Sequence, residues 1–174
     1  SERRKEGDYE QALNLYARIE NNYPGSVESS LGEKKKPAVL YDKAWALWKA
    51  KGNPGAALAL FQEIVAEHGN TEWADKAEDQ IPPVYLARAQ QRQQNGALEK
   101  ALDDVAKIRE AWPESGVAGE ATDLEATLLS DLYERARAQG NTDEASSYFA
   151  QLVSKHPDTP WAVRAARRKL GLQP

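Results

Sequence analysis

Residues 140–162 read GNTDEASSYFAQLVSKHPDTPWA, and the pattern within this stretch decides the fold. A glycine opens the stretch, an alanine follows at position 145, and apolar residues at positions 149 and 152 continue the same side of a helix. His156 and Pro157 end that helix, and Thr159 stands where a hydroxyl can cap the first N–H groups of the next one. The stretch therefore predicts a helix, a tight turn and a second helix.

The same pattern occurs four times along the chain. Its opening glycines are Gly7, Gly52, Gly96 and Gly140, separated by 45, 44 and 44 residues. The residues at the ring position are Tyr16, Phe61, Val105 and Phe149, and the capping hydroxyls belong to Ser26, Thr71, Ser115 and Thr159. Unrelated alanine-rich helices would not keep several positions in step, so the chain is predicted to be all-α, with about four helix–turn–helix units.

These repeated positions resemble the tetratricopeptide repeat, and Gly7, Tyr9, Ala12, Tyr16 and Pro24 carry the resemblance most completely. It implies a TPR-like α-solenoid, which we expect to form a single domain over residues 1–174 with units that start near the four glycines. The period of about 44 residues is unusually long, roughly ten residues beyond the length typical of the family.

Two phrases, Asn70–Ala74 and Pro157–Ala162, are similar to the variant of this repeat in bacterial outer-membrane assembly lipoproteins and in the periplasmic coordinator of the Tol-Pal system. The similarity implies a non-catalytic protein–protein interaction scaffold in the assembly or maintenance of the outer membrane, located in the periplasm or at the periplasmic face of that membrane. The alternatives are a cytoplasmic adaptor and a helical accessory domain of a larger enzyme. Because the chain starts at Ser1 and contains no Met, we expect it to be a piece of a longer protein, whose N-terminus could carry a lipid anchor.

The helices are predicted at residues 8–23, 38–51, 54–68, 72–81, 84–95, 97–112, 115–139, 142–156 and 160–170. Two gaps in this series rest on helix breakers. Glu33–Pro37, with its three lysines, is interpreted as a loop, and Pro82-Pro83 is expected to separate two helices.

Composition argues against several classes of function. The 27 acidic and 23 basic residues give a net charge of −4, which disfavours binding to nucleic-acid phosphates. The sequence contains no cysteine, no phosphate-binding loop and no nucleophile elbow, and no apolar run approaches the roughly 20 residues that span a membrane. His68 and His156 close helices two repeats apart, so they are not expected to share a metal ion. We therefore expect no enzymatic activity, cofactor or metal, and a protein or an extended peptide as the partner.

Burial can also be predicted from the repeat. Phe61 and Phe149 are expected to be buried between successive helices, because both stand at the ring position. The neighbouring acids Asp103 and Asp104 are interpreted as part of a solvated face. Arg88 and Arg92 are expected to face solvent or an acidic partner, since an unpaired guanidinium in a core is too costly. The basic residues Arg164, Arg167, Arg168 and Lys169 are attributed to the favourable field at a helix C-terminus.

The resemblance also implies a binding groove lined by polar residues on the first helix of each unit. Its predicted residues are Asp42, Lys43 and Lys49, then Gln90, Gln93 and Gln94, then Asp131, Glu134 and Arg137, with Trp48 as an apolar anchor. Such long polar side chains are suited to binding an extended peptide. The alternative is that they form only the wet face of the solenoid, and that the partner binds an edge.

Overall fold

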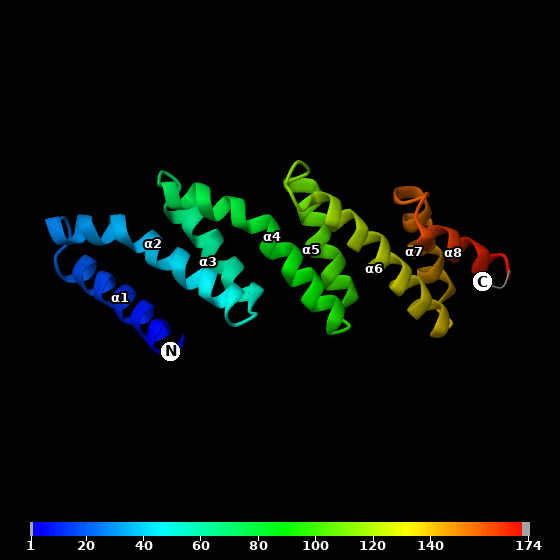
Figure 1. Ribbon diagram of the computed structural model, residues 1–174, viewed down its shortest axis with the longest axis horizontal. Coiled ribbons are helices and arrows are strands. Elements are labelled where there is room, and N and C mark those ends of the chain that lie inside the picture. Colours follow the sequence, from blue (N-terminus) through cyan, green and yellow to red (C-terminus); the bar gives the residue numbers. More distant parts are fainter. Residues whose placement is uncertain (1, 172–174) are drawn as a thin grey trace. The chain divides into compact units, whose positions relative to one another are not determined.

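The computed structural model describes residues 2–171, and it describes side chains from residue 8 onward. This part of the chain contains helices and no strands (Figure 1). The helices are α1 (Glu2–Asn22), α2 (Val27–Lys49), α3 (Pro54–Glu67), α4 (Glu72–Gln94), α5 (Leu98–Ala111), α6 (Ala118–Ala138), α7 (Thr142–Lys155) and α8 (Pro160–Lys169). Helices that pack against each other include α1 and α2, α2 and α3, α5 and α6, α6 and α7, and α8 with both α6 and α7. The prediction of an all-α, TPR-like α-solenoid fold is confirmed.

Contacts gather in two compact units, Ser1–Val84 and Tyr85–Pro174. The boundary falls inside α4, so the first part of this helix belongs to the N-terminal unit and the last part to the C-terminal unit. The expectation of one domain over residues 1–174 stays a prediction.

The turns between helices follow the glycines and hydroxyls of the repeat. Gly52, Gly96 and Gly140 have φ angles of 60°, 75° and 72°, a left-handed conformation in which a side chain would be strained. Ser26 and Thr159 cap α2 and α8 by accepting a hydrogen bond from a backbone N–H of the first turn. The turn chemistry of the repeat therefore sets where most helices begin and end.

The prediction for Ser115 is wrong. Helix α6 begins at Ala118, and its N-cap residue is Val117, which makes no side-chain capping bond. The Ser115 hydroxyl is buried and has no hydrogen-bond partner among the described residues. Two further turn residues here postpone the start of the helix, so the hydroxyl lies outside capping range.

Both helix interruptions predicted at proline are wrong. Glu33–Pro37 lies within α2, and α4 continues through Pro82-Pro83. A proline inside a helix costs roughly 3 kcal/mol because it removes one hydrogen bond and crowds the preceding turn. Here Pro37 and Pro82 are buried, so tertiary packing of the helix offsets that cost.

The ring position differs between repeats. Phe61 is fully buried, with 0% of its surface exposed, which confirms the prediction. Phe149 is only partly buried and packs at the border of the C-terminal core, where its ring centroid lies 5.9 Å from that of Tyr133. Full burial was therefore the wrong expectation for Phe149. In its repeat, the ring lines a cavity.

Candidate protein-binding site

The predicted groove residues of α2 lie in the N-terminal unit, and two of the cations there already have partners. Asp42 is exposed. Lys43 forms an ion pair with Glu10 of α1, with 2.6 Å between Nζ and Oε1. The Lys49 ammonium lies over the indole ring of Trp48, 3.5 Å from its centroid, so the anchor proposed for an apolar side chain carries a cation of the same chain.

The predicted residues of α4 and α6 lie in the C-terminal unit. Gln90 donates a hydrogen bond to Glu120, with 3.0 Å between Nε2 and Oε1, and Gln93 is half-buried. Gln94 and Asp131 are exposed. Apart from Glu134 and Arg137, the structure joins no two of the ten predicted residues by an ion pair or hydrogen bond that it resolves. The groove itself stays a prediction.

Glu134 and Arg137 are brought together with a residue that the sequence did not predict. The Glu134 carboxylate accepts a hydrogen bond from Arg168 of α8, with 2.6 Å between Nη1 and Oε2. The same Oε2 lies 3.6 Å from Nη1 of Arg137. The Arg137 guanidinium also lies over the Tyr133 ring, 5.5 Å from its centroid.

These residues border a cavity of about 270 Å³ within the C-terminal unit. It is lined by Tyr133 and Arg137 of α6, Gly140 of the turn, Thr142, Ala145, Ser146 and Phe149 of α7, and Arg168 and Lys169 of α8. The Lys169 ammonium lies over the Phe149 ring, 4.3 Å from its centroid. The cavity thus combines an aromatic floor with three cations, and its chemistry suits an anion.

Among the residues that line this cavity, sequence reasoning assigned only Arg137 to a binding site. Arg167, Arg168 and Lys169 do lie in the last turn of α8, as predicted, and a helix C-terminus favours cations there. That explanation did not require a second role for Arg168 and Lys169. The available signal was the number of basic residues in the last turn of α8, which is larger than interaction with the helix dipole requires.

Other charged residues form ion pairs in the interior of the protein. Asp104 is 1% exposed and was wrongly expected to be solvated. It accepts hydrogen bonds from Arg88 (2.9 and 2.6 Å) and from Arg92 (2.6 Å). Both arginines are only partly buried, and the acidic group that they face is a carboxylate of the next helix of the same chain. Such a triad joins α4 to α5 and leaves neither guanidinium unpaired.

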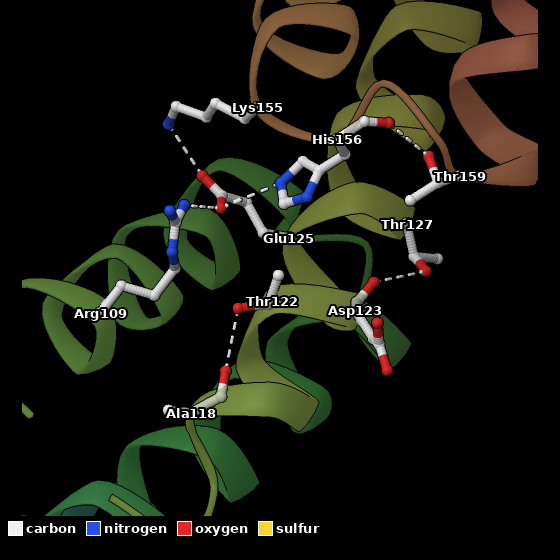
Figure 2. Close-up of polar contacts among 9 residues, drawn as sticks. All are labelled: Arg109, Ala118, Thr122, Asp123, Glu125, Thr127, Lys155, His156 and Thr159. Atoms are coloured by element: carbon white, nitrogen blue, oxygen red, sulfur yellow. Dashed lines mark hydrogen bonds and ion pairs between the residues drawn. The ribbon is translucent and has the colours of Figure 1, made fainter. Parts of the chain in front are cut away.

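A second buried carboxylate joins three helices (Figure 2). Glu125 of α6 is 1% exposed, and Figure 2 shows Arg109 reaching it from α5 and Lys155 and His156 from the end of α7. Lys155 Nζ lies 2.8 Å from Oε1, His156 Nε2 lies 3.1 Å from Oε2, and Arg109 also binds Oε2. Burial alone would raise the pKa of Glu125, but the hydrogen bond from Lys155 and the charges of Arg109, Lys155 and His156 lower it below its ordinary value. The group is therefore an ionised structural anchor.

His156 thus does more than close a helix and cover the turn. An ionised carboxylate can only accept hydrogen bonds, so the N–H group at His156 Nε2 donates a hydrogen bond to Glu125. Among the side chains that the structure describes, residues 8–171, no group of histidine and acidic residues is arranged to hold a metal ion.

Helical hairpins closed by glycine turns and hydroxyl caps define a helical-repeat protein. In comparison with known families, the tetratricopeptide repeat matches residues 2–26 and 129–159. The match covers α1 with the following turn, and then the end of α6 with all of α7. It supports the interpretation of the chain as a TPR protein. Comparison with curated proteins finds no match.

None of the helices in the described part of the chain is both long enough and apolar enough to cross a bilayer.

Proposed function

We propose that this protein is a non-catalytic scaffold that binds other proteins or extended peptides in the bacterial cell envelope, in the assembly or maintenance of the outer membrane. The observation that carries the scaffold role is the match of both ends of the chain to the tetratricopeptide repeat, a module that presents stacked helices to protein partners. The envelope location rests on the likeness of Asn70–Ala74 and Pro157–Ala162 to repeats of envelope proteins.

The distribution of charge supports a binding role over a catalytic one. The deeply buried acids, Asp104 and Glu125, are each held by several cations of neighbouring helices, so neither is available to act on a substrate. The exposed polar residues of α4 and α6, by contrast, remain available to a partner. The cavity of the C-terminal unit adds a concave site on the same repeat that the family match covers.

Site-specific photo-crosslinking in cells tests this proposal. A photoreactive amino acid is placed at Gln94 or Asp131, which are exposed residues of the predicted groove, and at Asp103, an exposed residue of α5, as the control. The expected result is one defined protein crosslinked from the first two positions and not from the third, recovered in the periplasmic or outer-membrane fraction. Crosslinks confined to cytoplasmic proteins would favour the adaptor instead, and a product from Asp103 alone would move the site to an edge.

Once a partner is identified, charge reversal locates its site. Lys49→Glu and Arg137→Glu change the charge of the predicted groove in the N-terminal and C-terminal unit, respectively. At least one is expected to weaken binding by about tenfold, because a lost charge pair and a new like-charge contact both oppose association. Unchanged affinity in both variants, with intact helical content by circular dichroism, would exclude the predicted groove.

A further inference from the structure

The cavity between the ends of α6, α7 and α8 has an unusual composition for a repeat interior. Its floor is formed by the tilted rings of Tyr133 and Phe149, and each ring has a cation over it, Arg137 on the first and Lys169 on the second. Arg168 completes the group. The equivalent ring of the second repeat, Phe61, is fully buried. Three cations at an accessible cavity, two of them held over aromatic rings, form a positively charged site.

Among the residues that the structure describes, Glu134 is the only carboxylate paired with these cations. It binds Arg168 at 2.6 Å and lies 3.6 Å from Arg137, while it leaves Lys169 without an acidic partner among the described residues. A guanidinium has five N–H donors, and Glu134 engages one nitrogen of each arginine. Glu134 itself does not line the cavity. The arginines are therefore held beside the opening and keep donors for a second carboxylate.

We propose that this cavity binds the carboxylate side chains of an extended acidic peptide and that Glu134 is its internal competitor. This inference rests on the scaffold function proposed above and names the chemistry of the partner. Arg137, Arg168 and Lys169 bind the acidic groups, and the rings of Tyr133 and Phe149 cover the aliphatic part of a Glu side chain. The hydroxyls of Thr142 and Ser146 stand at the same cavity and can bind peptide amides.

The cavity is small and open, which suits the insertion of single side chains. It measures about 270 Å³, near the lower end of the roughly 300–1,000 Å³ usual for small-molecule sites. Its basic side chains are also partly exposed, at 43% for Arg137 and 41% for Arg168, so a chain can lie across the opening and insert one or two residues.

Fluorescence anisotropy of the full chain tests the proposal with two labelled peptides. One has alternating Glu and Ser, and the other has Gln in place of every Glu. The acidic peptide is expected to bind, and Arg137→Glu is expected to weaken its binding by about tenfold or more. The matched control is Arg164→Glu, which makes the same charge change on α8, where Arg164 lies over Trp161 and does not line the cavity. Its effect is expected to stay within about twofold, because an exposed charge outside the site acts only through a screened field.

Glu134 allows a test in the opposite direction. Glu134→Gln removes the competing charge at nearly constant size, so the acidic peptide is expected to bind about threefold to tenfold more tightly. Asp123→Asn removes the same charge from the same helix at an exposed residue outside the predicted groove and serves as the control for net charge. Equal gains in both variants would show that the field of the whole protein, and not Glu134, governs binding.

Three results would overturn the proposal. They are equal binding of the acidic and Gln peptides, equal losses in Arg137→Glu and Arg164→Glu, and displacement of the peptide by inorganic phosphate at concentrations below the peptide's own dissociation constant. If Arg137→Glu loses helical content, Lys169→Gln takes its place in the comparison. Failure of the scaffold function is distinguishable, since crosslinks at Gln94 and Asp131 would disappear as well, whereas failure of this inference alone leaves them intact.

Discussion

The second and fourth repeats share one pattern and use it differently. In the second, Phe61 is sealed in the core, and the histidine that closes α3, His68, has a buried Nε2 without a hydrogen-bond partner among the described residues. In the fourth, Phe149 is half-buried beside a charged cavity, and the equivalent His156 binds a buried carboxylate (Figure 2). The repeat thus determines the position of a side chain, whereas the residues packed around that side chain determine its contacts.

The residue responsible for this difference can be found by counting back the same number of residues from each histidine. Glu125 precedes His156 by 31 residues, and the residue that precedes His68 by the same separation is Pro37. Proline has no side-chain acceptor, so the second repeat has an apolar residue where the fourth has a charged one. The fourth repeat therefore has buried ionic contacts, between Glu125 and His156, where the second repeat has an apolar side chain.

The largest expected effect contrasts the two ring positions. Phe61→Ala should lower the free energy of unfolding by about 4 kcal/mol, because it removes a fully buried ring and leaves a cavity. Phe149→Ala should cost about half as much, since part of the ring is already exposed. Urea unfolding followed by circular dichroism measures both. Equal losses would contradict the difference in burial on which the comparison rests.

The next effect concerns the buried carboxylate. Glu125→Ala should cost about 3 kcal/mol, because it leaves Arg109, Lys155 and His156 beside a buried site without their shared anion. The control is Glu99→Ala, which breaks the ion pair between Glu99 and Arg135, both of them solvent-exposed. That loss should stay below about 1 kcal/mol, as for surface pairs in general. A similar cost for both variants would show that Glu125 is no anchor.

The repeat made much of the fold predictable, and its failures have one physical cause. Helix ends at Gly52, Gly96 and Gly140 could be predicted because a left-handed turn is a local requirement. The continuation of α4 through Pro82-Pro83 could not, since it depends on burial against other helices.

The same division applies to the candidate site. Arg137 followed from the repeat, but Arg168 joins it only through the packing of α8 on α6. The pairing of Arg88 with Asp104 likewise depends on contact between two helices, which no spacing within one helix indicates.

A smaller effect should appear on acidification. The pKa of Glu125 in the folded protein lies below its ordinary value, so the unfolded chain binds more protons at acidic pH. The stabilisation by Glu125 is therefore fully present above the unfolded value of about 4.3 and is lost as the pH falls through the lower folded value. Urea midpoints of the wild type and Glu125→Gln should differ near neutral pH and converge in acid. A difference that grew on acidification would contradict the sign.

The smallest effects test the two histidines directly. In the other repeats Tyr23 and Trp112 stand at this position, so an aromatic ring without imidazole nitrogens fits the site. His68→Phe should therefore be neutral or stabilise the protein by about 1 kcal/mol, because it removes a buried nitrogen that lacks a partner. His156→Phe should instead destabilise it by about 1–2 kcal/mol, because Glu125 loses a hydrogen-bond donor. Thermal and urea unfolding of both variants measure the pair. Opposite signs at equivalent positions would show that Glu125 makes the difference between the repeats, whereas equal changes would attribute both histidines to ring packing alone.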